Sequence, residues 1–177
     1  MFDLDRFVAD CRAAVDQDPT HKTVTEHMRR AMSAPDAVRA TLGAPTEPGV
    51  WPIYQSSDLT ILNLAWKPSM TIPPHNHEMW AVIGIYGGRE DNIFWRRIKD
   101  HPDGLIEAAG AQALSTGDVC PMGPDIIHSV TNPIPRLTGA LHVYGGDFFE
   151  AERSEWEPEA LKENRLDIET VRARFSD

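Results

Sequence analysis

Between Val50 and about Phe149, the sequence consists of short apolar runs that are separated by turn residues. The run DLTILNLAW alternates and is rich in β-forming residues; WAVIGIYGG, NIFWRRI, GLIEAAG, AQALSTGDVCPMG, IIHSVTN and LTGALHVYGG follow it at short intervals. Many short strands with turn residues between them are typical of an all-β sandwich or barrel. The pattern therefore predicts an all-β core for this part of the chain.

Helical spacing marks both flanks of this core. Residues 1–45 contain LDRFVADCRAAV, TVTEHMRRAM and SAPDAVRATLG, and apolar residues recur in the first two at helical spacing. Residues 151–177 form a C-terminal tail, in which SEWEPEALKENRLDIETVRARFSD returns to a polar helical pattern. Since no linker separates two units, we expect one domain over residues 1–177, with the barrel at 50–150.

The bulk composition excludes several classes of function. The 177 residues carry a formal net charge of −10, and an acidic chain without a basic block is a poor candidate for binding nucleic acid or an anionic membrane. Cys11 and Cys120 lie far apart, which indicates a reducing compartment and no disulfide framework. Without a signal peptide or a long apolar run, we expect a cytoplasmic protein.

Histidines stand at three places in the predicted barrel. PPHNHEMW holds His75 and His77, which would share one strand face, with the prolines marking the start of the strand. A bare HxH pair is weak evidence for a metal site. His128 in IIHSV is flanked by apolar residues, so it is either a core histidine with one hydrogen bond or a ligand. His142 and Tyr144 in LHVYGG share a strand face.

The spacing of Gly117, Pro121, Gly123, His128 and Asn132 resembles the second motif of the cupin superfamily. PPHNHEMW followed by GIYGG resembles the first motif, and together the two cover roughly residues 60–145. The resemblance implies a double-stranded β-helix, or jelly-roll, which is a small antiparallel barrel with a site in its mouth.

One departure from the cupin pattern concerns the carboxylate ligand. The common first motif has a glutamate four or five residues after its second histidine, where this chain has Ala81 and Val82. Glu78 follows His77 directly and would point to the opposite strand face. The remaining ligand set is neutral and suits Fe(II), Zn, Ni or Cu; it consists of His75, His77 and His128.

The segments LAWKPSMTIPPHNHEMW and DIIHSVTNPIPRLTGALHVYGGDF resemble the thiol dioxygenases, which are the cysteine dioxygenases and their bacterial relatives acting on 3-mercaptopropionate. The resemblance covers about residues 50–153. It implies Fe(II) as cofactor, a small thiol and O2 as substrates, and a sulfinate as product. Tyr144 would donate a hydrogen bond near bound oxygen or substrate, and His142 would orient Tyr144. The family has a serine two residues before this histidine, and this chain has Ala140 at that position. The serine–histidine–tyrosine relay is therefore incomplete.

A carboxylate-bearing thiol requires a cation in the site. Arg153 matches an arginine that mercaptopropionate-type members have shortly after the tyrosine; the alternative is a solvated arginine in the acidic run FFEAERSEWEPE. Gln55 in WPIYQSSD corresponds to the polar or cationic group that cysteine dioxygenases place before the first motif. GGREDN is expected to form a turn with an ion pair.

Three functions remain open at this point. The first is an Fe(II) thiol dioxygenase acting on a small mercapto-acid, 3-mercaptopropionate or cysteine. The second is another three-histidine cupin enzyme, such as a dioxygenase of a diketone, and the third is a metal- or ligand-binding cupin without turnover. The pair of His142 and Tyr144 favours the first. The sequence leaves open which thiol is the substrate, which metal is native and which oligomeric state the protein adopts.

Overall fold

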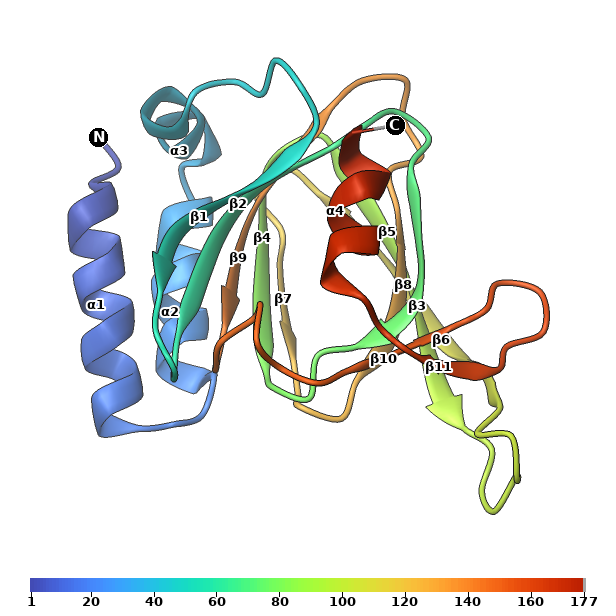
Figure 1. The fold of residues 1–177 in the computed structure, drawn as a ribbon. Coiled ribbons are helices and arrows are strands. Elements are labelled where there is room, and N and C mark those ends of the chain that lie inside the picture. The colour runs from blue at the N-terminus through green and yellow to red at the C-terminus, as the bar shows by residue number, and fades with distance from the viewer. Residues whose placement is uncertain (177) are drawn as a thin grey trace.

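The structure is a computed structural model that describes residues 1–176. The N-terminal helices are α1 (Leu4–Gln17), α2 (Lys22–Met32) and α3 (Pro35–Leu42), and α4 (Ile168–Ser176) ends the described chain (Figure 1). The strands are β1 (Gly49–Gln55), β2 (Thr60–Trp66), β3 (Thr71–Asn76), β4 (Ala81–Gly87), β5 (Arg89–Arg97), β6 (Ile106–Ser115), β7 (Val119–Met122), β8 (Ile127–Thr131), β9 (Thr138–Tyr144), β10 (Ser154–Trp156) and β11 (Glu163–Arg165).

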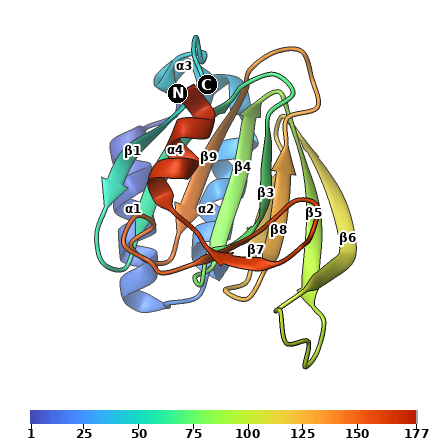
Figure 2. The ribbon, with the colours of Figure 1, turned by 45° about the vertical axis from the view of Figure 1, so that its right-hand side comes forward.

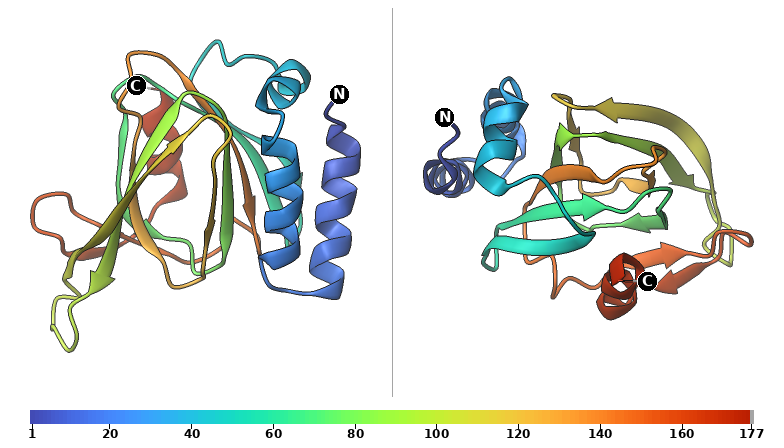
Figure 3. Two further views of the ribbon diagram at one scale, coloured as in Figure 1. Left: turned by 180° about the vertical axis from the view of Figure 1, so that it is seen from behind. Right: turned by 90° about the horizontal axis from the view of Figure 1, so that it is seen from above.

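The strands form two sheets, and every strand pair is antiparallel. The strand orders are β1-β2-β9-β4-β7 and β11-β10-β3-β8-β5-β6, so strands far apart in the sequence lie side by side. Viewed from above, the two sheets face each other and enclose the core (Figure 3). The predicted all-β barrel with N-terminal helices is confirmed.

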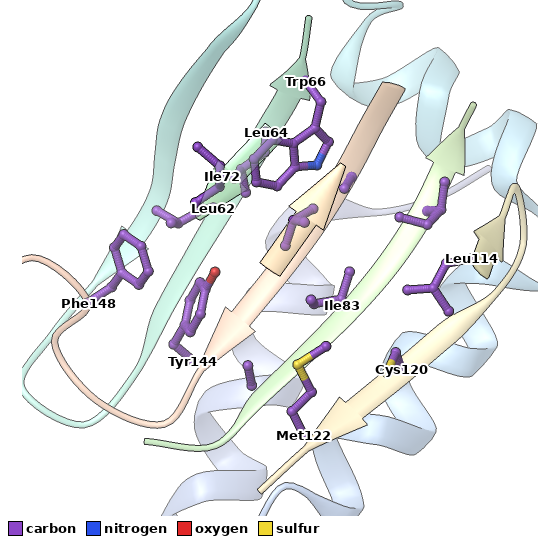
Figure 4. Packing of buried hydrophobic residues seen from close by; sticks show 14 of the residues in the cluster. Leu62, Leu64, Trp66, Ile72, Ile83, Leu114, Cys120, Met122, Tyr144 and Phe148 are labelled. Carbon is purple, nitrogen blue, oxygen red and sulfur yellow. The ribbon is translucent and has the colours of Figure 1, made fainter. Parts of the chain in front are cut away.

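The barrel interior is filled by apolar side chains from the inner faces of both sheets. Figure 4 shows Leu62, Leu64 and Trp66 along β2, with Tyr144 and Phe148 beside them. On β4, alternate residues serve two cores: Ile83 and Ile85 point into the barrel, whereas Val82 and Tyr86 pack under the helices. A strand buried on both faces reads as a continuous apolar run, which explains the sequence AVIGIYG.

The N-terminal helices cover the outer face of the sheet that contains β4 and β9 (Figure 1). Asp3 caps the N-terminus of helix α1, and its carboxylate accepts a hydrogen bond from the Arg6 backbone N–H at 3.0 Å. Helix α2 approaches β4 closely at Gly84, where an added Cβ would lie 2.5 Å from the Met28 sulfur. The absence of a side chain at this position therefore allows the helix to pack directly on the sheet.

The C-terminal segment differs from the predicted polar helix in its first half. Residues 154–165 form the hairpin of β10 and β11, and β10 adds to the second sheet through the pairing of Glu155 with His75 (Figure 2). Only α4 is helical. It lies beside β1, and its Phe175 packs 5.2 Å from the Trp66 ring, so the helix closes part of one barrel end.

Two local predictions were wrong. GGREDN does not form a turn, because β5 begins at Arg89 and continues to Arg97. The predicted ion pair is present on this strand, and it joins Arg89 to Asp91 at 2.7 Å. The prolines of PPHNHEMW do not start a strand but lie inside β3, at a register shift between Ile72 and His75. Within residues 1–176, no helix is long and apolar enough to cross a membrane.

Candidate metal centre

Three histidine side chains meet in the barrel, as the sequence predicted. His75 on β3 is the register partner of His128 on β8, and His77 follows the end of β3. The ring centroids of the three lie 4.6 to 5.1 Å apart, and one nitrogen of each lies within 4.8 Å of the others. His77 and His128 are buried, whereas His75 is half-buried. The group has the spacing and the donor type of a metal-binding site.

The other ring nitrogens of two of these histidines are held by neighbouring oxygen atoms. His75 Nδ1 lies 2.9 Å from the Pro73 carbonyl oxygen, and His128 Nδ1 lies 2.7 Å from Asn92 Oδ1. Each Nδ1 therefore carries the hydrogen and donates it, which leaves the Nε2 lone pair for a metal ion. This arrangement orients the imidazoles as ligands and fits a bound divalent metal.

Burial keeps the three imidazoles neutral. Burial lowers the pKa of His75 to about 4, although the hydrogen bond that His75 donates to the Pro73 carbonyl acts in the opposite direction and raises this pKa. The pKa values of His77 and His128 lie well below the ordinary histidine range, first because of burial and then because a proton on either ring would be repelled by neighbouring basic side chains, chiefly the other histidines. Neutral imidazole is the form that binds metal, so all three side chains are in a form that could bind a metal ion at neutral pH.

Carboxylates are absent from this ligand group in the part of the chain that the structure describes. Glu78 is exposed in a turn after β3, has a φ of 55°, and accepts a hydrogen bond from the Asn76 side chain. Its expected position on a strand was wrong, because β3 ends at Asn76. The second carboxylate near the histidines, Glu90, binds Asn92 instead.

His142 and Tyr144 lie beside the three histidines and contact each other. His142 Nδ1 is 2.9 Å from the Tyr144 hydroxyl oxygen, and the Tyr144 ring is 5.1 Å from that of His77. Burial raises the pKa of the Tyr144 hydroxyl above its ordinary value, so it stays protonated at neutral pH. The pair therefore places a neutral phenol next to the ligand group.

Sequence reasoning placed Glu90 in a turn of GGREDN and did not single out Asn92. Both are at most 1% exposed on β5, and Asn92 Nδ2 donates to Glu90 Oε1 at 2.9 Å. Within the run REDNIF they alternate with the more exposed Arg89 and Asp91, so a period of two was the available signal. Asn92 joins this carboxylate to His128.

The two proposed substrate-binding residues lie in different environments. Arg153 is only 5% exposed; its guanidinium lies 4.1 Å above the Phe148 ring and donates to the Phe148 carbonyl at 2.6 Å. Burial lowers its pKa, yet an arginine remains charged. It is therefore not a solvated arginine. Gln55 is exposed at the end of β1, where its amide donates to Asp147.

Comparisons with known proteins bear on the fold. No protein-family model matches the chain. The chain is similar to a structure from Bacillus halodurans, with a TM-score of 0.51 and 10% identity, over 62% of this chain and 77% of that one. A Klebsiella pneumoniae protein with a double-stranded β-helix domain matches with a TM-score of 0.43 and 14% identity, over 70% of this chain and 88% of that one. An RmlC-like cupin family protein from Methanocaldococcus jannaschii matches with a TM-score of 0.47 and 10% identity, over 59% of this chain and 85% of that one.

The two facing antiparallel sheets described above make up the barrel of this chain. The fold is a cupin double-stranded β-helix. At identities of 10 to 14%, the likeness is one of fold alone and does not extend to the substrate.

One small cavity borders the histidine group. It has a volume of about 40 Å³ and lies beside His75 and Tyr144; aromatic and apolar side chains line it, including Trp66 and Phe148, and α4 contributes Phe175. A separate open polar groove of about 970 Å³ is lined by Arg153 and Glu78 but by none of the three histidines. Arg153 therefore lines a charged groove, whereas the space against His75 is small and mostly apolar.

Proposed function

We propose that the protein is an Fe(II)-dependent thiol dioxygenase, which oxidises a small mercapto-acid such as 3-mercaptopropionate or cysteine to its sulfinate. The observation that carries this proposal is the all-imidazole ligand group with the His142–Tyr144 pair beside it. His75, His77 and His128 would hold the metal. When bound, Fe(II) supplies a redox-active centre that brings a thiolate and O2 together, and both oxygen atoms end on sulfur.

The neutral ligand group favours an anionic substrate. Three uncharged imidazoles leave the charge of a divalent ion uncompensated in a buried site, and no carboxylate of residues 1–176 belongs to the ligand group. A thiolate would supply the missing negative charge. The Tyr144 hydroxyl, which stays protonated, would hydrogen-bond to the substrate or to oxygen.

Arg153 supports a substrate that also carries a carboxylate. Its guanidinium is buried, and among the described residues no carboxylate lies within ion-pair distance of it. A buried charge without a counter-ion is costly, so an anionic ligand would stabilise it. This feature favours a mercapto-acid over a neutral diketone. Gln55, bound to Asp147 at the surface, has no such argument in its favour.

The test is an oxygenation assay on purified protein that is loaded with Fe(II) under anaerobic conditions. 3-Mercaptopropionate, cysteine and a thiol without a carboxylate are added separately, and O2 uptake and sulfinate are measured. We expect one O2 consumed per sulfinate formed with at least one of the acids. Stoichiometric iron without O2 uptake for any of these thiols would refute the proposal.

A further inference from the structure

Glu90 and His142 each have a buried polar atom without a partner. Glu90 is 0% exposed and His142 is 2% exposed. Within residues 1–176, neither Glu90 Oε2 nor His142 Nε2 makes a hydrogen bond, and the two atoms face each other at 3.7 Å. A buried polar atom left unpaired costs about 1–3 kcal/mol. A small side-chain rotation that joins these two would remove both penalties.

The hydrogen-bond directions around Glu90 follow from the metal ligand His128. With Nε2 of His128 directed at the metal position, its Nδ1–H donates to Asn92 Oδ1. The Asn92 amide must then present its Nδ2 hydrogens to Glu90 Oε1, at 2.9 Å. The first oxygen of Glu90 is therefore committed to Asn92, and the second is directed at His142.

We propose that Glu90 is a positioning residue, which accepts a hydrogen bond from Nε2–H of His142 and thereby fixes the imidazole that holds Tyr144. The consequence for turnover rests on the proposed function, but the hydrogen bond itself does not. The Glu90 carboxylate thus lies next to His142 Nε2, whereas Tyr144 lies next to His142 Nδ1. Two residues before His142, at the position of the serine in the thiol dioxygenases, this chain has Ala140. The network runs from the ligand His128 through Asn92, Glu90 and His142 to Tyr144.

The protonation of His142 decides what the Tyr144 hydroxyl can do. If only Nε2 is protonated, Nδ1 accepts the phenol hydrogen, and the phenol oxygen is left to accept from a ligand. If Nδ1 is protonated as well, it donates to the phenol oxygen, and the phenol hydrogen is free to donate. In both states Glu90 holds Nε2–H and keeps the ring in place.

The replacement Glu90→Gln tests this, because it retains the shape of the side chain. The glutamine oxygen would accept from Asn92, so the glutamine NH2 would face His142 Nε2, which must then lose its hydrogen. We would measure the 15N shifts of histidine-labelled protein, metal-free and loaded with diamagnetic Zn²⁺, and assign His142 from the signals missing in His142→Gln. We expect Nε2 of His142 to be protonated in the wild type and unprotonated in Glu90→Gln. An unprotonated Nε2 in the wild type, or no change in the variant, would overturn the proposal.

The control is Glu107→Gln, which changes an exposed glutamate on the adjacent strand β6 and should leave the His142 shifts unaltered. If Glu90→Gln does not fold, the wild-type spectrum alone still decides, since the proposal requires a hydrogen on Nε2. In the thiol assay we expect kcat of Glu90→Gln to fall about tenfold with little change in KM; an unchanged kcat would overturn the role of Glu90 in turnover. Wild-type protein that has the predicted tautomer but oxidises no thiol would refute only the proposed function.

Discussion

The Nε2 atoms of His77 and His128 lie 3.3 Å apart, although the two residues are 51 positions apart in the sequence. His128 Nδ1 is already committed to Asn92, so its Nε2 presents a lone pair towards His77. Two neutral nitrogens that approach this closely need a shared hydrogen or a cation between them. This relationship is the geometric basis for a metal site, and it directs the first prediction.

The replacement His128→Ala should abolish stoichiometric binding of Fe(II) and Zn²⁺, because it removes one of the three proposed ligands. Metal content after dialysis would be measured by elemental analysis, and the Zn²⁺-induced rise in melting temperature by calorimetry. His101→Ala, which changes a histidine in the β5–β6 loop, should bind metal like the wild type. Retention of one metal ion per chain by His128→Ala would contradict the ligand assignment.

The replacement Tyr144→Phe should retain the metal but lower kcat about ten- to a hundredfold, because it removes the hydroxyl beside the ligand group. Tyr86→Phe is a matched control. The Tyr86 hydroxyl is also buried and donates to Asn63 at 2.8 Å, but it belongs to the outer core under the helices. Both variants lose one buried hydrogen bond, so similar losses of stability are expected. Equal kinetics for the two variants would remove the role proposed for Tyr144.

The parts of the structure that could be predicted from the sequence have local or motif-level signals. Alternating apolar runs with turn residues indicated the barrel, and Pro35 and Gly43 at the two ends of α3 marked that helix. That His75 and His128 lie close together could be predicted only from the resemblance to the cupin motifs, because it is the pairing of β3 with β8 that makes them neighbours.

The features that were missed depend on non-local pairing. The run REDN has the charge of a solvated turn, yet β5 pairs with β8 and β6, and this pairing directs Glu90 and Asn92 into the barrel. The segment around Glu155 has helical composition, but it adds to the edge of β3. Arg153, two residues earlier, is also buried and contacts Phe148. Neither sequence period nor composition reports such edge pairing.

Acid should destabilise the metal-free protein. His77 and His128 have pKa values well below the ordinary histidine range because they are buried. At mildly acidic pH they therefore stay neutral in the folded protein, whereas the same histidines become protonated in the unfolded chain. The unfolded state then binds more protons as the pH falls below about 6.5, and each histidine lowers the unfolding free energy by about 1.4 kcal/mol per pH unit. Urea unfolding at several pH values between 7.5 and 5 would measure this slope. His128→Asn should have a smaller slope, and equal slopes would contradict the assignment to these histidines.

Arg153 should distinguish thiols that carry a carboxylate from thiols that do not. In Arg153→Gln, we expect kcat/KM for the mercapto-acid to fall about ten- to a hundredfold, which corresponds to the 1.5–3 kcal/mol typical of a hydrogen bond to a charged group. The value for a thiol without a carboxylate should change little. These expectations concern the contact of Arg153 with the substrate carboxylate.

Because Arg153 also donates to the Phe148 carbonyl, the replacement will alter the packing near Phe148. Such a change would act on both thiols alike, so the ratio of the two kcat/KM values isolates recognition of the carboxylate. Arg165→Gln, an exposed arginine of the same groove that pairs with Glu152, is the control and should leave the ratio unchanged. An equal loss for both thiols in Arg153→Gln would show that Arg153 supports the structure and does not bind the substrate.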